Sequence, residues 1–133
     1  MQLKKPGGCP IVMVVDEEPV VRAFLCVYLR DCGYLTLSVE SAEKAIALLA
    51  AKVAVDLVFS DVRMSGESDG YDLARWIAEN RPGLPVILTS GDAAKENAAN
   101  MLCSAEVLSK PYGFDHAVTR IRKRIERPPA MRH

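Results

Sequence analysis

The chain has 133 residues, of which 50% are hydrophobic and 26% are charged, a composition typical of one globular domain. Lys plus Arg and Asp plus Glu number 17 each, so the formal net charge is +0 at pH 7 and bulk charge favours binding to neither nucleic acid nor acidic lipid. No apolar run approaches the ~20 residues that span a bilayer, and the first residues lack the apolar segment of a secretory signal. We therefore expect a cytoplasmic domain that binds neither nucleic acid nor membrane.

Short apolar runs alternate with helical patterns along the chain. The runs are rich in β-branched residues or alternate apolar with polar residues, which predicts strands at residues 11–15, 34–39, 57–59, 86–89 and 106–108. Apolar residues at helical spacing predict the intervening helices at residues 19–32, 42–52, 71–80 and 93–102. A last helix begins near Phe114 and is stopped at residues 127–129 by Arg-Pro-Pro.

Five strand–helix repeats of this spacing predict an α/β fold. The strands should be parallel and joined by right-handed crossovers, with helices on both faces of one sheet. In such sheets the ligand site lies beyond the carboxyl ends of the strands, where the strand order reverses. We therefore look for chemistry in the residues at those ends.

The carboxyl ends of the predicted strands carry charge or a hydroxyl. After the first, third, fourth and fifth strands come, in order, Asp16 with Glu17, Asp61, Ser90 and Lys110. In a parallel sheet these ends meet at one edge, so the three carboxylates would surround one crevice. Carboxylates that close raise one another's pKa and cost stability. A hard divalent cation such as Mg²⁺ removes this repulsion, because it prefers carboxylate and water oxygens.

A site with a metal ion and Lys110 can hold one further anion, and a phosphoryl group fits. The metal and Lys110 would neutralise phosphoryl oxygens, and the Ser90 hydroxyl would form a hydrogen bond to another. One carboxylate could then act as a nucleophile and form an acyl phosphate. Asp61 is the best candidate, because it is central and follows a buried strand.

Five segments together resemble the response-regulator receiver domain of two-component signalling. They are residues 14–19 (VVDEEP), 60–64 (SDVRM), 69–70 (DG), 85–91 (PVILTSG) and 110–111 (KP). Each segment is weak alone, but five in this order at strand ends are specific. The resemblance covers residues 10–127 and leaves residues 1–9 and 128–133 as short flexible tails. It implies a doubly wound (βα)5 fold with the flavodoxin-like strand order 2-1-3-4-5.

The resemblance also assigns a role to each residue at the strand ends. It implies that Asp61 is the phosphoacceptor, that Ser90 is the switch hydroxyl and that Lys110 is the ion-pair partner of the phosphoryl group. The implied ligands of Mg²⁺, for which Mn²⁺ could substitute, are Asp16, Glu17, Asp61 and the backbone carbonyl of Arg63. Such a protein is a signalling phosphoacceptor and not an enzyme: it assists only its own phosphorylation and dephosphorylation.

The implied partners are proteins. A member of this family receives phosphate from a histidine kinase or a histidine phosphotransfer protein. It then changes the surface formed by its fourth helix, fifth strand and fifth helix, where a downstream protein target binds. We expect this chain to do so as a monomer or weak dimer.

The sequence departs from the family pattern at three positions and in the length of one segment. Glu17 stands where Asp is usual and adds a methylene to a metal ligand, although Mg²⁺ geometry is strict. Ser65 replaces the usual Pro, and the segment from Asp61 to Gly70 is one residue longer than is common. Val107 replaces the usual Tyr or Phe. Without that ring, an output signal must travel by another rearrangement.

Other interpretations remain open. The chain could be a pseudo-receiver, a binding module that never takes phosphate. It could also be a small flavin- or phosphate-handling enzyme on the same sheet. A flavin carrier needs an uncharged loop after the first strand, whereas Asp16, Glu17 and Glu18 would repel phosphate without a metal. An aspartyl-phosphate phosphatase would need a second Asp as general acid where Arg63 stands.

Overall fold

The predicted strands form one parallel sheet of order β2-β1-β3-β4-β5 in a computed structural model that describes residues 8–91 and 105–126. The strands are β1 (Ile11–Val15), β2 (Leu35–Val39), β3 (Leu57–Asp61), β4 (Val86–Ser90) and β5 (Glu106–Ser109). All neighbouring pairs run parallel. The expected flavodoxin-like order is therefore confirmed.

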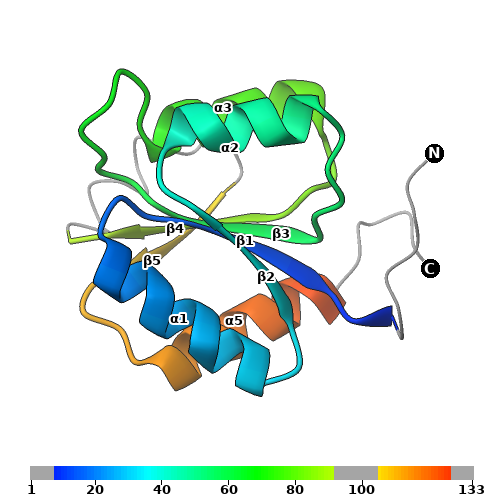
Figure 1. Ribbon diagram of the computed structural model, residues 1–133, viewed down its shortest axis with the longest axis vertical. Helices are drawn as coiled ribbons and strands as arrows, with labels where there is room; N and C mark the ends of the chain where they lie inside the picture. The colour runs from blue at the N-terminus through cyan, green and yellow to red at the C-terminus, as the bar shows by residue number, and fades with distance from the viewer. Residues whose placement is uncertain (1–7, 92–104, 127–133) are drawn as a thin grey trace.

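Helices cover both faces of this sheet. In the described residues they are α1 (Pro19–Asp31), α2 (Ala42–Ala50), α3 (Gly70–Asn80) and α5 (Phe114–Glu126). Figure 1 shows α1 and α5 on one face and α2 and α3 on the other, which confirms the doubly wound α/β class. The predicted helix at residues 93–102 and the expected tail at residues 128–133 lie outside the described residues, as does most of the expected N-terminal tail.

Each face of the sheet has its own apolar core. Successive side chains of a strand point to opposite faces, so Met13 and Val15 pack with α2 and α3. Val12 and Val14 pack with α1 and α5. The central strands β1, β3 and β4 are buried almost throughout, because helices cover both sides of them. This double burial holds the carboxyl ends of these strands rigidly at one edge.

Two element boundaries differ from the prediction by two residues, whereas the other differing boundaries shift by one. Strand β3 continues to Asp61 instead of ending at Phe59, because Ser60 and Asp61 pair with the neighbouring strand β4. Helix α2 ends at Ala50 instead of residue 52. Its end is set by Lys52, whose φ of 68° lies in the left-handed region that cannot continue a right-handed helix.

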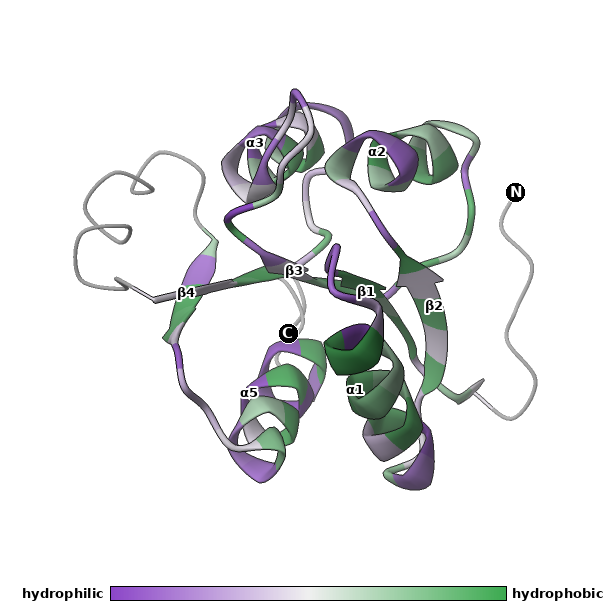
Figure 2. Ribbon diagram, turned by 60° about the vertical axis from the view of Figure 1, so that its left-hand side comes forward, coloured by the Kyte–Doolittle hydropathy of each residue, from purple (hydrophilic) through white to green (hydrophobic). Residues whose placement is uncertain are grey.

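Exposed apolar side chains gather on α1 and the adjacent strand β2. The large ones among the described residues are Val20, Val21, Phe24, Val27 and Leu35, with Phe24 64% exposed. In Figure 2 the ribbon of α1 is largely green, the colour of hydrophobic residues. No helix in the described ranges is both long and apolar enough to cross a membrane. Exposed apolar side chains clustered on one helix favour contact with another molecule.

Candidate functional site

An ion pair between Lys110 and Asp61 joins two of the predicted site residues. The Lys110 Nζ donates to Asp61 Oδ1 at 2.9 Å. Asp61 is the last residue of β3, and Lys110 follows the end of β5, where its backbone N–H donates to the Ser90 carbonyl at 2.8 Å. The Asp61 side chain is only 13% exposed, against 39% for Lys110. The edge of the sheet therefore carries the nearly buried carboxylate of Asp61, which is ion-paired with the ammonium group of Lys110.

Asp16 lies close enough to this ion pair for both charges to shift its pKa. Burial raises the pKa of Asp16 above its ordinary value, and the Asp61 carboxylate raises it further, although the Glu18 N–H and Lys110 act in the opposite direction. The Glu18 N–H donates to Asp16 Oδ1 at 2.9 Å. The raised pKa means that the site resists a second negative charge, and a hard cation would relieve that resistance.

The carboxylate of Glu17 is directed elsewhere. Its Oε1 accepts hydrogen bonds from the Ser65 backbone N–H at 2.9 Å and from the Ser65 hydroxyl at 2.7 Å. These two bonds lower the pKa of Glu17. In the part of the chain that the structure describes, no three His, Cys, Asp or Glu side chains are grouped closely enough to hold a metal ion. The structure therefore brings together Asp16, Asp61 and Lys110, but not Glu17.

A cleft of about 560 Å³ opens beside the ion pair. It is lined by Asp16, Glu18, Val21, Asp61, Lys110, Pro111, Tyr112 and Phe114. The rest of the lining is thus largely apolar, and it includes Val21 on the exposed side of α1. Sequence reasoning gave Val21, Tyr112 and Phe114 no place in the site, because no motif marks them, and Glu18 of the VVDEEP segment was not named as a site residue. The only signals were their positions next to Asp16 and Lys110.

Tyr112 connects the cleft to the core beneath it. Its ring packs edge-on against Phe59, with ring centroids 5.8 Å apart. Burial raises the pKa of Tyr112 to about 12, and the negative charges of Asp16 and Asp61 contribute. The phenol therefore stays protonated at neutral pH and adds no charge to the cleft.

Ser90 and Arg63 occupy the remaining predicted positions. Ser90 is the last residue of β4 and 2% exposed. It follows Thr89, which pairs with Asp61 across the two strands, so Ser90 ends the strand that neighbours the phosphoacceptor candidate. Arg63 is exposed and lies two residues past Asp61. Metal ligation by the Arg63 carbonyl stays a prediction.

Close packing of α3 fixes the backbone of Asp61. A Cβ atom on Gly70 would lie 2.5 Å from the carbonyl oxygen of Asp61 and 2.8 Å from the Cα of Val62. The Gly70 N–H donates to the Val62 carbonyl at 2.8 Å. Only glycine allows the first residue of α3 to approach this closely. The helix therefore supports the end of β3.

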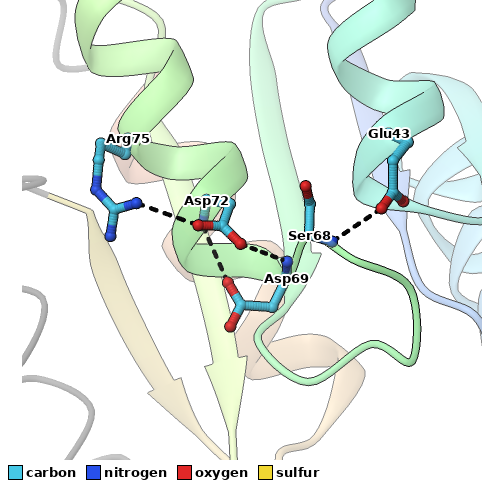
Figure 3. Close-up of polar contacts among 5 residues, drawn as sticks. All are labelled: Glu43, Ser68, Asp69, Asp72 and Arg75. Atoms are coloured by element: carbon cyan, nitrogen blue, oxygen red, sulfur yellow. Dashed lines mark hydrogen bonds and ion pairs between the residues drawn. The ribbon is translucent and has the colours of Figure 1, made fainter.

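The loop between β3 and α3 is also held from α2. Glu43 Oε2 accepts the backbone N–H of Ser68 at 2.8 Å, as Figure 3 shows. Next to this contact, Asp69 and Asp72 form a reciprocal capping box at the start of α3, and Arg75 donates to Asp72 at 3.1 Å. The end of the loop that leads into α3 is therefore anchored by several contacts.

The family of the chain follows from comparison with known proteins. Residues 12–122 match the model of the response regulator receiver domain, so the chain belongs to that family. It is 30% identical over 128 residues to the probable transcriptional regulatory protein TcrX of Mycobacterium tuberculosis, covering 94% of this chain and 54% of that protein. It covers 26% and 24% of two further curated regulators. The chain thus spans about half of its relative TcrX and about a quarter of the other two.

Solved structures agree with this assignment. A response regulator receiver protein of Sinorhizobium medicae has 30% identity and a TM-score of 0.82, covering 89% of this chain and 95% of the other. The response regulator TrrA of Thermotoga maritima, solved in complex with Mg²⁺-BeF, has 25% identity and a TM-score of 0.78, covering 86% and 98%. The resemblance to receiver domains is confirmed in both sequence and fold.

Proposed function

We propose that this protein is a phosphoacceptor in which Asp61 takes a phosphoryl group from a phosphohistidine. One observation carries the proposal: Lys110 binds Asp61 at 2.9 Å while the Asp16 carboxylate lies beside them at the same sheet edge. An ordinary structural ion pair would not need a second, partly buried carboxylate. Membership of the receiver family supports the same function.

The acidic residues fit a divalent cation. Asp16 and Asp61 supply hard oxygen donors, and the raised pKa of Asp16 reflects burial and the charge of Asp61, which a cation would compensate. We assign Mg²⁺, or Mn²⁺ in its place, to Asp16 and Asp61, with Glu17 and the Arg63 carbonyl as further ligands. The metal would supply charge neutralisation at the phosphoryl oxygens. The Mg²⁺-BeF complex of the relative TrrA supports this assignment.

The residues of the chain account for the transfer itself. With Oδ1 of Asp61 bound to Lys110, we assign Oδ2 as the nucleophile that attacks phosphorus. A P–O bond forms, the P–N bond breaks, and its electron pair returns to the imidazole nitrogen of the donor. Lys110 then exchanges its contact with Asp61 for a phosphoryl oxygen, and the Ser90 hydroxyl donates to another. Positioning and charge neutralisation of this kind dominate phosphoryl transfer.

The surface around the cleft favours a protein as phosphodonor. Val21 and Phe114 line the cleft, and Phe24 on the same helix as Val21 is largely exposed. A histidine kinase or a histidine phosphotransfer protein could bury this apolar surface while presenting its phosphohistidine to Asp61. A downstream target would read the surface of β5 and α5, together with the predicted fourth helix. We expect a monomer or weak dimer.

A second candidate function is a pseudo-receiver that binds partners without phosphorylation. The hydrogen bonds of Glu17 to Ser65 favour it, because they leave the predicted acidic set incomplete. Both candidates keep the same fold and surfaces. They differ in whether Asp61 reacts.

Intact-protein mass spectrometry separates the two candidates. After incubation with acetyl phosphate and Mg²⁺, the wild-type chain should gain the mass of one phosphoryl group, and Asp61→Asn should gain none. Asp115→Asn is the matched control, because Asp115 is an exposed aspartate at the start of α5. It should be phosphorylated like the wild type. No gain in the wild type, or an equal gain in Asp61→Asn, would reject the proposed function.

A further inference from the structure

Glu17 is held outside the cleft by one residue of the β3–α3 loop. We propose that Ser65 is a positioning residue that holds Glu17 away from the metal site, so that Mg²⁺ binds only by displacing Ser65 from Glu17. The inference rests on the proposed function, because it takes the ion site at Asp16 and Asp61 as given. It assigns to Ser65 control over metal affinity.

The two donors that bind Glu17 both belong to Ser65. The backbone N–H and the hydroxyl converge on the single oxygen Oε1, at 2.9 and 2.7 Å. The usual residue at this position, Pro, has neither an N–H nor a hydroxyl and could make neither bond. The Glu and the Ser, both unusual at their positions, therefore interact directly with each other.

Binding to Ser65 and binding to the metal exclude each other. With Glu17 in contact with Ser65, the described residues contain no grouping of three acidic, His or Cys side chains that could hold an ion. Glu17 does not line the cleft, although Asp16 and Glu18 on either side of it do. To complete the metal site, the Glu17 carboxylate must therefore move toward Asp16 and Asp61.

Ser65 is not free to follow that movement. The loop is anchored beyond it by Glu43, which accepts the Ser68 N–H at 2.8 Å (Figure 3). A Cβ on Gly66 would lie 3.0 Å from the Glu43 carboxylate oxygens, and Gly70 packs directly against the Asp61 backbone. A loop fixed at these points keeps Ser65 in place. Metal binding must therefore break the contact between Glu17 and Ser65.

Calorimetric titration with Mg²⁺ tests this role on the whole chain. Ser65→Ala removes the hydroxyl bond and should tighten the dissociation constant for Mg²⁺ about three- to tenfold, the net effect of one typical hydrogen bond. Ser65→Thr keeps both donors and should bind like the wild type. Ser68→Ala is the matched control in the same loop, because Ser68 contacts Glu43 through its backbone N–H. It too should bind like the wild type.

A second measurement follows the contact itself. In the metal-free protein, the Ser65 amide proton should resonate downfield and exchange slowly, because a carboxylate accepts it. Addition of Mg²⁺ should remove both signatures, and the Ser68 amide, held by Glu43, should keep its own. A Ser65 amide that stays protected at saturating Mg²⁺ would overturn the exclusion.

The outcomes separate this inference from the function beneath it. Equal Mg²⁺ affinity in Ser65→Ala and the wild type overturns the role of Ser65 alone. Weaker affinity in Ser65→Ala also overturns it, because Ser65 would then orient Glu17 toward the metal. If neither protein binds Mg²⁺ at millimolar concentration while both remain folded by circular dichroism, the metal site fails and the proposed function fails with it.

Discussion

Asp61 and Glu17 are both carboxylates predicted to hold the same ion, yet different parts of the fold position them. Asp61 is the last residue of β3, a strand buried between two helical layers and paired with β4 up to this residue. Glu17 lies between β1 and α1, and its side chain is held by the loop residue Ser65. The first position is set by the sheet, and the second by hydrogen bonds at the surface.

This difference separates the fixed part of the site from its adjustable part. Asp61 cannot move without disturbing the sheet, so the nucleophile is preorganised. Glu17 can exchange one set of partners for another at the cost of two exposed hydrogen bonds. Substitutions at the sheet edge should therefore affect the chemistry or the fold strongly. Substitutions of surface groups should have smaller effects, on the affinity for Mg²⁺ or on the pKa values of single groups.

The largest effect should come from removing the ammonium group of Lys110, which is paired with the fixed carboxylate of Asp61. Lys110→Ala removes the charge that neutralises Asp61 and the incoming phosphoryl group, so phosphorylation by acetyl phosphate should slow about 100-fold. The free energy of unfolding should change by less than about 1 kcal/mol, because the pair is partly exposed. Rates of phosphoryl gain by mass spectrometry and urea unfolding measure the two effects.

Lys44→Ala is the matched control for this substitution. Lys44 of α2 also forms an exposed ion pair, at 3.2 Å with Glu40, which lies just before the helix. Its removal should change neither the phosphorylation rate nor, beyond about 1 kcal/mol, the stability. Equal rates in Lys110→Ala and Lys44→Ala would show that the ammonium group takes no part in the chemistry.

The backbone support of Asp61 should come next in size. Gly70→Ala places a Cβ 2.5 Å from the Asp61 carbonyl oxygen, so α3 must shift away from the end of β3. We expect a loss of about 1–3 kcal/mol in the free energy of unfolding, and slower phosphorylation of the remaining folded protein. Urea unfolding followed by circular dichroism measures the loss.

Gly91→Ala makes the same chemical change where the structure leaves room. Among the described residues, a Cβ on Gly91 would meet no atom within 4 Å, so the stability of this variant should stay within about 0.5 kcal/mol of the wild type. If Gly70→Ala were as stable as Gly91→Ala, the close approach of α3 would not fix Asp61.

The electrostatics of Asp16 give a smaller effect with a definite sign. Its pKa is raised in the folded chain, so between the unfolded value near 3.8 and the raised value the folded state holds more protons than the unfolded state. Stability therefore falls as pH rises through this window, and the loss persists at neutral pH. Asp16→Asn should be more stable than the metal-free wild type at neutral pH. Thermal unfolding in metal-free buffer measures this.

Asp72 provides the control of opposite sign. Its pKa is lowered, chiefly by the Asp69 backbone N–H, so its contribution to stability is present at neutral pH and is lost as pH falls through the lowered value. Asp72→Asn should therefore destabilise the protein at neutral pH. If both variants shifted stability in the same direction, the cost assigned to burying the Asp16 charge beside Asp61 would be wrong.

Positions set by the sheet could be predicted from the sequence, whereas positions set by surface hydrogen bonds could not. Strand periodicity and parallel topology were enough to place Asp16, Asp61 and Lys110 at one edge, because buried strands leave little freedom. The hydrogen bonds from Ser65 to Glu17 could not be predicted, because the two residues lie 48 positions apart in the sequence. An exposed side chain also has several possible hydrogen-bond partners. The apolar wall was missed for a related reason: Tyr112 enters the cleft through packing on Phe59, which no local pattern encodes.

The smallest expected effect concerns the titration of Tyr112. It tests whether the negative charges of Asp16 and Asp61 shift the pKa of this cleft residue. Burial raises its pKa to about 12, with Asp16 and Asp61 adding to the shift. The folded state thus keeps its proton where the unfolded state, with a pKa near 10.0, has lost it. This contribution to stability is complete below pH 10.0 and is lost as pH rises toward about 12.

The titration of Tyr112 can be measured by tyrosinate absorbance, as the difference between the wild type and Tyr112→Phe. In an Asp61→Asn background the difference titration should move to lower pH, because one negative charge is gone. An unchanged midpoint would mean that the phenol does not sense the charge of Asp61, and that burial and Asp16 account for the raised pKa.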